Sequence, residues 1–154
     1  MNLNKVIMVF IVILVLFVGI VYFQIVTNSA PKSKVTINTH TFSVKVATTS
    51  AQQQQGLSGV KQLPQDQGML FVFNSAQKYA FWMKEMKFPL DLVFIKDDKI
   101  VTIVENAPLP KNANDTLPIY QPDAPADKVL EINAGLAKKY DFKKNDAVKI
   151  VIAK

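Results

Sequence analysis

Residues 90–105, LDLVFIKDDKIVTIVE, are the stretch that decides the fold class. Two runs of β-branched and large apolar side chains flank a central Asp-Asp pair, which is typical of two strands joined by a tight turn. The pattern predicts a β-hairpin in which Ile95 faces Ile100. In the same register Asp91 faces Val104. Because both faces of the hairpin are largely apolar, we expect it to be covered on both sides.

Similar short apolar stretches, each bounded by turn residues, lie on both sides of the hairpin. Further strands are predicted at 35–37, 42–48, 69–73, 78–84, 128–132 and 147–152, and short helices at 50–58 and 134–140. Ser50 and Asn133 are the predicted N-caps of the two helices. Strands at this spacing favour a single mainly β domain over residues 35–154, a jelly-roll-like antiparallel sandwich or barrel with two short helices.

The first 26 residues have a different composition. No residue in the run 6–23 carries a charge, and a helix of about 20 apolar residues crosses the hydrocarbon layer of a bilayer. Residues 1–26 are therefore predicted to form one transmembrane helix that anchors the chain through residues 6–26. A cleaved signal peptide is the alternative, but the run is long for one, and Asn28 lies where cleavage after Ala30 needs a small residue.

The polar stretch 27–34, TNSAPKSK, is predicted to be a tether between the anchor and the domain. Short N-terminal tails usually stay in the cytoplasm. We therefore expect a single-pass protein of the cytoplasmic membrane with its domain on the extracytoplasmic side, or a secreted domain if the N-terminal segment is cleaved.

Two charged residues, Lys84 and Asp91, lie inside stretches that otherwise suit a protein core. A lone buried charge is costly. One interpretation is therefore a structural ion pair between them, or a lysine that reaches past Trp82 to water. The other places Trp82, Lys84 and Asp91 in a pocket that binds a flat polar ligand such as a sugar. The long proline-rich loop 107–127 contributes Tyr120 to such a site if it is a lid rather than a crossover between sheets.

The chain lacks the residues that several kinds of functional site require. The chain has no cysteine and a single histidine, His40, so we expect no metal site, no cofactor and no Ser-His-Asp triad. All 18 basic residues are lysines, the formal net charge is +6, and the lysines are scattered rather than clustered. Because nucleic-acid binding requires a basic stripe with exposed aromatic residues, we expect no nucleic-acid partner.

A pair of carboxylates could act in acid–base hydrolysis, and Asp91 and Glu105 are the natural pair. In the predicted register they point to opposite faces of the hairpin. A shift of one residue would bring them to the same face, which keeps a hydrolase as an alternative.

Five motifs occur in order along the chain: GLSG at 56–59, LPQDQGMLFVF at 63–73, FWMK at 81–84, PLDLVFI at 89–95 and VLEINAG at 129–135. With these motifs the chain resembles, over residues 40–152, a bacterial and archaeal family known as domain of unknown function 192. The resemblance implies a mainly β, jelly-roll-like sandwich that is often exported behind a signal or anchor, with no assigned reaction.

The resemblance also indicates positions that recur in the family. They fall on Gly56, Leu57, Gly68, Met69, Phe81, Trp82, Met83, Lys84, Pro89, Leu90, Asp91, Glu131 and Gly135. This chain departs from the family pattern twice: it has Val60 where members usually carry arginine, and Glu85-Met86 where they carry Asn-Thr. If that arginine and asparagine line a pocket in the family, the pocket is altered here.

The sequence thus predicts a membrane-anchored extracytoplasmic domain whose function is binding. The candidate ligand-binding residues are Trp82, Lys84, Asp91 and Tyr120, and the expected partner is a small polar or carbohydrate-like molecule or a protein of the cell envelope. An acid–base hydrolase and a purely structural envelope module are the two alternatives.

Overall fold

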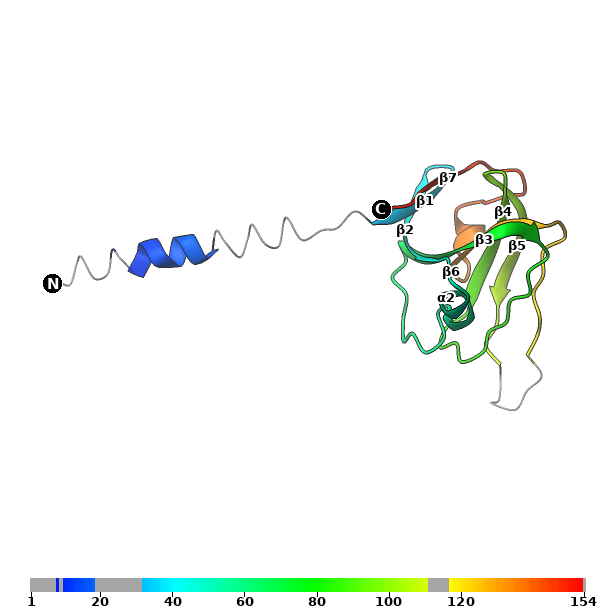
Figure 1. Ribbon diagram of the computed structural model, residues 1–154, viewed down its shortest axis with the longest axis horizontal. Helices are drawn as coiled ribbons and strands as arrows, with labels where there is room; N and C mark the ends of the chain where they lie inside the picture. The colour runs from blue at the N-terminus through cyan, green and yellow to red at the C-terminus, as the bar shows by residue number, and fades with distance from the viewer. Residues whose placement is uncertain (1–7, 9, 19–31, 111–116, 154) are drawn as a thin grey trace. The chain divides into compact units, whose positions relative to one another are not determined.

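The computed structural model describes Met8 and residues 10–18, 32–110 and 117–153. The chain divides into two units, Met1–Pro31 and Lys32–Lys154. In the first unit Met8 and residues 10–18 are helical, and their apolar side chains are exposed (Figure 1). No helix within the described ranges is long and apolar enough to cross a membrane. Most of the predicted anchor lies outside the described residues, so the anchor stays a prediction.

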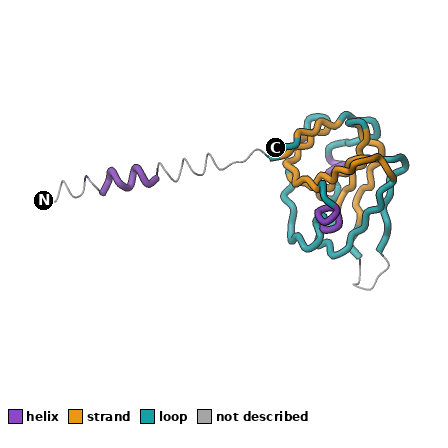
Figure 2. The backbone as a smooth tube through the Cα atoms, in the orientation of Figure 1, coloured by secondary structure: helices purple, strands orange, loops and turns teal. Residues whose placement is uncertain are grey.

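The described residues of the second unit form seven strands and two short helices. They are β1 (Ser33–Ile37), β2 (His40–Ala47), α2 (Ser50–Gln55), β3 (Gln67–Gln77), β4 (Leu90–Lys96), β5 (Lys99–Ala107), β6 (Ala126–Asn133), α3 (Leu136–Lys139) and β7 (Val148–Val151). The mainly β prediction is therefore confirmed (Figure 2).

All seven strands belong to one sheet in the order β5-β4-β6-β3-β2-β1-β7. The pair β2 and β3 is parallel and is connected through α2, whereas the other neighbouring pairs are antiparallel. The sequence left a sandwich or a barrel open, and a single curled sheet agrees with the barrel rather than with the sandwich. The prediction that all strands pair antiparallel is wrong for β2 and β3. Because β6 inserts between β3 and β4, and α2 returns the chain to pair β3 with β2, every strand stays in the same curled sheet.

The curled sheet almost closes on itself, because its two edge strands β5 and β7 approach one another. Lys99 and Ala147 form an isolated bridge between them. Backbone N–H groups of Ile100 and Val148 donate to the carbonyls of Asp146 and Asp98 at 3.1 and 2.9 Å. The domain is therefore a partly closed barrel.

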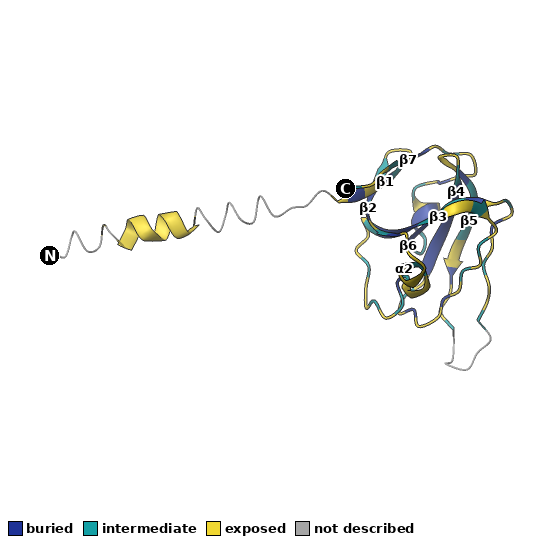
Figure 3. Ribbon diagram, in the orientation of Figure 1, coloured by how far each residue is buried: buried dark blue, intermediate teal, exposed yellow. Residues whose placement is uncertain are grey.

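The strands of the sheet contain many buried residues (Figure 3), and their side chains form two separate core clusters. The inner core takes residues from all seven strands and from α3: Val35, Ile37, Phe42, Val44, Leu70, Val93, Ile95, Ile100, Leu130, Ile132, Leu136, Ala137, Phe142 and Val148. The outer core lies on β3, β6 and β4: Ala47, Leu57, Met69, Phe71, Met83, Met86, Leu90, Leu92, Phe94, Ala107, Ala126 and Val129. Only a curled sheet can bring residues from both edges into one inner cluster.

The hairpin that decides the fold class is β4 and β5. Residues 90–95 are buried, which confirms that β4 is covered on both sides. Ile95 pairs with Ile100 as predicted, but Leu92 rather than Asp91 pairs with Val104. The register shifts by one residue between Phe94 and Ile95, so most of β5 lies one position away from the predicted pairing.

The stretch 78–84, predicted as a strand, is not one. Apart from an isolated bridge at Phe81, the chain from Lys78 to Pro89 is irregular and supplies Met83 and Met86 to the outer core. It crosses the outer face of the sheet because that face is apolar and needs a cover.

Candidate functional site

Two turns that are far apart in the sequence bind one another beside α2. Gly56 ends that helix with φ 49°, a conformation that suits glycine. The Ser58 hydroxyl donates to the Lys84 carbonyl at 2.9 Å, and the Gly59 N–H donates to the Glu85 carbonyl at 3.1 Å. The GLSG motif thus fixes the turn that carries the FWMK motif.

Trp82 points away from the domain because of the pairing of the residue before it. Phe81 and Tyr120 exchange both backbone hydrogen bonds, at 2.9 and 2.8 Å, and both side chains pack against the outer core. Successive side chains of an extended segment point to opposite sides. Trp82 is consequently 55% exposed, although it is the only tryptophan of the chain.

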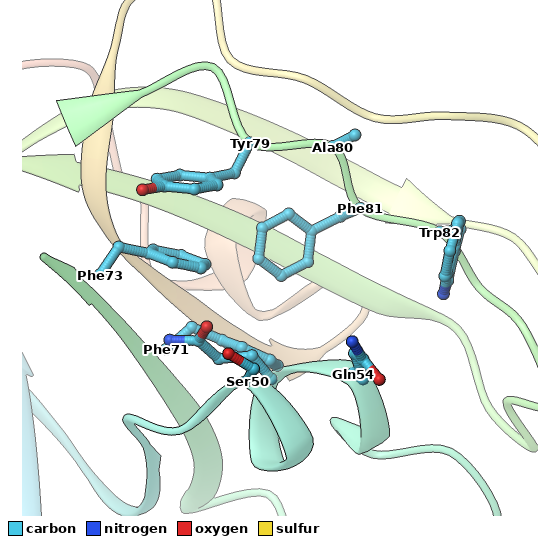
Figure 4. A pocket seen from close by; sticks show the side chains of 9 residues that line it. Ser50, Gln54, Phe71, Phe73, Tyr79, Ala80, Phe81 and Trp82 are labelled. Atoms are coloured by element: carbon cyan, nitrogen blue, oxygen red, sulfur yellow. The ribbon is translucent and has the colours of Figure 1, made fainter. Parts of the chain in front are cut away.

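One side of Trp82 borders a hollow that we name the aromatic pocket, with a volume of about 280 Å³. Its lining is Ser50, Gln53, Gln54, Phe71, Phe73, Tyr79, Ala80, Phe81 and Trp82. Phe73 and Tyr79 are stacked with their ring centroids 3.7 Å apart, and Phe81 meets Phe71 edge to face at 5.1 Å. Figure 4 shows the rings of Phe73, Tyr79 and Phe81 opposite Ser50 and Gln54 of α2.

The other side of Trp82 borders a second hollow, the polar pocket, of about 400 Å³. Its lining is Gln54, Gln55, Ser58, Trp82, Lys84 and Glu85. Trp82 and Gln54 line both pockets. The two hollows are therefore neighbours on either side of one exposed indole ring.

The glutamine-rich helix α2 forms one wall of both pockets. Its N-cap is Thr49 rather than the predicted Ser50, and Thr49 and Gln52 form a capping box. The Gln53 amide donates to the Val72 carbonyl at 2.8 Å, which ties the helix to β3. Gln54 is exposed and makes no side-chain hydrogen bond with any described residue, so its amide is available to a ligand.

Asp91 does not belong to this site. Its carboxylate accepts hydrogen bonds from the backbone N–H groups of Asn106, Gly135 and Ala137 at 2.8, 3.1 and 2.8 Å. The side chain is fully buried and lines neither pocket. Asp91 therefore holds the start of α3 and the end of β5 in place.

The structure separates the predicted site residues into two groups. Trp82 and Lys84 lie together at the polar pocket, and Lys84 is exposed. The ion pairs among the described residues are Lys128–Asp127 and Lys143–Asp141, so Lys84 and Asp91 do not form one there. Tyr120 is half-buried against the outer core and lines neither pocket.

The predicted pair of carboxylates is not a catalytic pair in this structure. Backbone amides occupy both oxygens of Asp91, whereas Glu105 is exposed on the edge strand β5. An acid–base mechanism through these two residues would need Asp91 to release its partners.

Glu131 is a buried acid that sequence reasoning treated only as a recurring position. It lies on β6 between Met69 of β3 and Leu92 of β4, and 6% of its surface is exposed. Burial raises the pKa of Glu131 from 4.5 to about 8. Its Oε2 atom has no hydrogen-bond partner among the described residues. It lines neither pocket beside Trp82.

The recurring motifs contact one another in pairs. The PLD motif at 89–91 contacts the NAG motif at 133–135. The Ala134 N–H donates to the Pro89 carbonyl at 3.2 Å, and the Gly135 N–H donates to the Asp91 carboxylate. Gly68 of the second motif lies against Glu131 of the last one, because a Cβ added to Gly68 would lie 2.6 Å from the Glu131 carbonyl oxygen. Four of the eight remaining recurring positions, Leu57, Met69, Met83 and Leu90, are buried in the outer core. The motifs therefore chiefly build the scaffold.

One predicted detail at a polar residue is corrected. Asn133 does not cap α3; its amide donates to the carbonyl of Leu63 at 2.9 Å, and Gly135 is the N-cap. His40, the single histidine, is half-buried and stacks on Tyr140 with ring centroids 3.7 Å apart. Within the described part of the chain no three metal-binding side chains cluster together.

The two departures from the family pattern also acquire a structural setting. Glu85 has φ 58°, a left-handed conformation that asparagine tolerates better than glutamate. Val60 is half-buried against the outer core. The backbone conformation at position 85 is therefore sufficient to explain a preference for asparagine, without a role in ligand binding.

Sequence reasoning missed most of the residues that line the pockets. No binding role was predicted for Ser50, Gln53, Gln54, Gln55, Ser58, Phe73 or Tyr79. The run of four glutamines at 52–55 was the available signal, because a row of amides on a short exposed helix needs no packing partner. The aromatic lining had no signal, since alternating phenylalanines in a strand also indicate a core.

The protein is a small β domain of the partly closed barrel type. Its candidate site lies at the surface, where Trp82 borders an aromatic and a polar pocket. The particular family follows from the sequence match: a family model covers residues 33–150, and the chain belongs to the DUF192 family, described as an uncharacterised ACR.

Two solved structures resemble this chain at about one third sequence identity. A protein of unknown function from Novosphingobium aromaticivorans is 33% identical, with a TM-score of 0.66 over 77% of this chain and 83% of that chain. A putative transcription regulator from Sinorhizobium meliloti is 34% identical, with a TM-score of 0.70 over 79% of this chain and 95% of that chain. No curated protein matches the chain.

Proposed function

We propose that the domain is a binding module for a small polar, carbohydrate-like ligand, and that the ligand lies against Trp82. The observation that carries the proposal is an exposed indole ring with a pocket on each side, one of which is lined by amide, hydroxyl, ammonium and carboxylate groups. Flat aromatic faces and a few polar groups are the usual lining of a small-molecule site. The exposed face of the Trp82 ring offers a flat apolar surface on which a sugar ring can stack.

The geometry around Trp82 supports a preformed site. The hydrogen bonds from the Ser58 hydroxyl and the Gly59 backbone N–H hold the turn at 84–85, and the Phe81–Tyr120 bridge holds the segment before the tryptophan. A ligand would therefore meet an ordered surface, which reduces the entropy lost on binding.

The rival functions have weaker support. A hydrolase would lack its proposed carboxylate pair, because Asp91 is held by backbone amides. A purely structural module would leave unused the two pockets that border Trp82. We do not extend the transcription-regulator description of the S. meliloti protein to this chain. The lysines of this chain are scattered along the sequence, whereas nucleic-acid binding requires them to cluster. A protein of the cell envelope remains the second kind of partner.

We also propose that residues 6–26 anchor the protein in the cytoplasmic membrane and that the domain faces the extracytoplasmic side. The support is the uncharged apolar run in the sequence. Alkaline extraction of membranes should leave the full chain in the pellet and release a variant that lacks residues 1–26. Release of the full chain would refute the anchor without affecting the proposed site.

The single tryptophan makes the binding proposal directly testable. Soluble gluco-, manno- and chito-oligosaccharides should be titrated into the full chain while Trp82 fluorescence is followed. We expect a saturable change in emission with at least one series and no hydrolysis product. Gln54→Ala should weaken binding, and Gln62→Ala, an exposed glutamine outside both pockets, should not. If no series changes the emission, the carbohydrate proposal is wrong.

A further inference from the structure

The two pockets beside Trp82 differ in chemistry. Five aromatic rings line the aromatic pocket, and its polar lining consists of the neutral side chains Ser50, Gln53 and Gln54. The polar pocket has no ring besides Trp82 itself. A ligand that is polar throughout would use only one of the two hollows and would leave the aromatic rings in contact with water.

The aromatic pocket has room for a compact apolar group. An apolar cavity of about 150 Å³ accommodates benzene, and the volume here is about 280 Å³. One substituted ring or a short alkyl chain therefore fits. The stacked pair Phe73 and Tyr79 forms one wall, and α2 forms the opposite wall (Figure 4).

The polar pocket selects for a neutral, hydroxyl-bearing group. Its two charged side chains, Lys84 and Glu85, have opposite formal charges, so the lining carries no net charge. Ser58 and Gln55 are engaged in the turn, because Ser58 donates to the Lys84 carbonyl and Gln55 donates to the Ser58 carbonyl at 3.0 Å. A hydroxyl can accept from the ammonium and donate to the carboxylate, which suits a sugar ring.

We infer that the ligand is a neutral amphiphile that spans both pockets: a glycoside whose sugar lies in the polar pocket and whose apolar aglycone lies in the aromatic pocket, with Trp82 between them. This inference rests on the proposed function, because it places the carbohydrate part at the same tryptophan. It adds that the substituent on the sugar contributes as much to recognition as the sugar does.

The test compares ligands that occupy one or both pockets. Methyl and phenyl β-glycosides of glucose, galactose and N-acetylglucosamine, together with phenol, are titrated into the full chain in phosphatidylcholine nanodiscs, with empty nanodiscs as the reference. Since a buried aromatic ring is removed from water, at least one phenyl glycoside should bind about tenfold or more tightly than its methyl counterpart and than phenol.

Two variants assign each part of the ligand to its pocket. Ser50→Leu places a larger side chain in the aromatic pocket from its α2 wall without removing a core contact, and should abolish the advantage of the phenyl group while methyl glycosides still bind (Figure 4). Lys84→Met should weaken both kinds of glycoside and leave phenol unaffected. Circular dichroism of each variant verifies that the fold is retained.

The outcomes separate this inference from the proposed function. Equal affinity for methyl and phenyl glycosides of every sugar would overturn the inference and leave the carbohydrate site standing. Phenol that binds as tightly as the phenyl glycosides would overturn it as well, because the sugar would then contribute nothing. No binding by any of these compounds would overturn the inference, and the oligosaccharide titration then decides the proposed function separately.

Discussion

The Asp91 carboxylate on β4 accepts a hydrogen bond of 2.8 Å from the backbone N–H of Ala137 in α3, 46 residues further along the chain. Together with Gly135 and Asn106, Ala137 supplies Asp91 with three backbone donors. A carboxylate in this position replaces the side-chain cap that α3 lacks. The charged residue of the PLD motif is therefore part of the scaffold.

The first prediction is that Asp91→Asn destabilises the domain by about 2–3 kcal/mol. Asparagine offers one carbonyl acceptor, and its amide N–H₂ would face a backbone donor that then loses its partner. Urea unfolding of the full chain, followed by circular dichroism, measures the loss. Glu105→Gln, an exposed acid on β5, is the matched control and should change stability by less than about 0.5 kcal/mol.

A related comparison tests the absence of coupling between Asp91 and Lys84. Lys84→Met should be close to neutral, because Lys84 is exposed and lies outside any ion pair formed among the described residues. The double variant should then lose the sum of the two single effects. Relief of the Asp91→Asn loss by Lys84→Met would contradict the assignment.

The second prediction concerns pH. The pKa of Glu131 is raised by burial from 4.5 to about 8. Between these two pH values the unfolded chain loses the proton while the folded chain keeps it, so the stability falls as the pH rises. The slope due to this group is about 1.4 kcal/mol per pH unit at most.

Glu131→Gln removes this group from the titration. The variant should therefore gain stability relative to the natural protein as the pH rises from about 5 to 8, by up to a few kcal/mol. Urea unfolding of both proteins at several pH values measures the difference in their free energies of unfolding. The titration of all other groups is common to both proteins and cancels in this difference. A difference that stays constant with pH would mean that Glu131 is already ionised in the folded protein.

The third prediction separates a steric glycine from a conformational one. Gly68→Ala should cost more than about 2 kcal/mol, because the new Cβ would lie 2.6 Å from the Glu131 carbonyl oxygen and would force β3 and β6 apart. Gly59 has φ 76° and open space around its Cβ position, so Gly59→Ala should cost only about 1 kcal/mol. Thermal unfolding of both variants gives the comparison, and equal losses would exclude the close approach of the strands.

The fourth prediction is that Glu85→Asn stabilises the domain by about 0.5–1 kcal/mol. Glu85 has φ 58°, which is unfavourable for most side chains and tolerated by asparagine. Lys84→Asn, at the neighbouring position of the same turn, is the control and should bring no gain, since Lys84 does not have a positive φ. Equal gains at both positions would show that the backbone conformation is not the cause.

The fold class could be predicted from local pattern, and the topology could not. The two apolar runs that flank Asp97-Asp98 in LDLVFIKDDKIVTIVE are sufficient to predict β4, β5 and the tip at Ile95 and Ile100. The register shift next to the tip leaves no mark on the sequence, because both faces of the hairpin are apolar. The order of the strands depends on β6, whose partners β3 and β4 are distant along the chain.

Only the part of the candidate site that is local in the sequence could be predicted. Trp82 and Lys84 are neighbours in the sequence, and an exposed tryptophan beside a lysine could be recognised there. The rest of the site comes from α2 and β3, which only tertiary packing brings next to them.

The sequence by itself determined that this chain contains a mainly β domain of the DUF192 family, because strand patterns and motifs are local properties. The tertiary structure alone decided that Asp91 is a structural residue while Lys84 belongs to a surface pocket. The physical reason is that the role of a charged side chain depends on which donors and acceptors surround it. For Asp91 these are backbone amides from two distant segments of the chain.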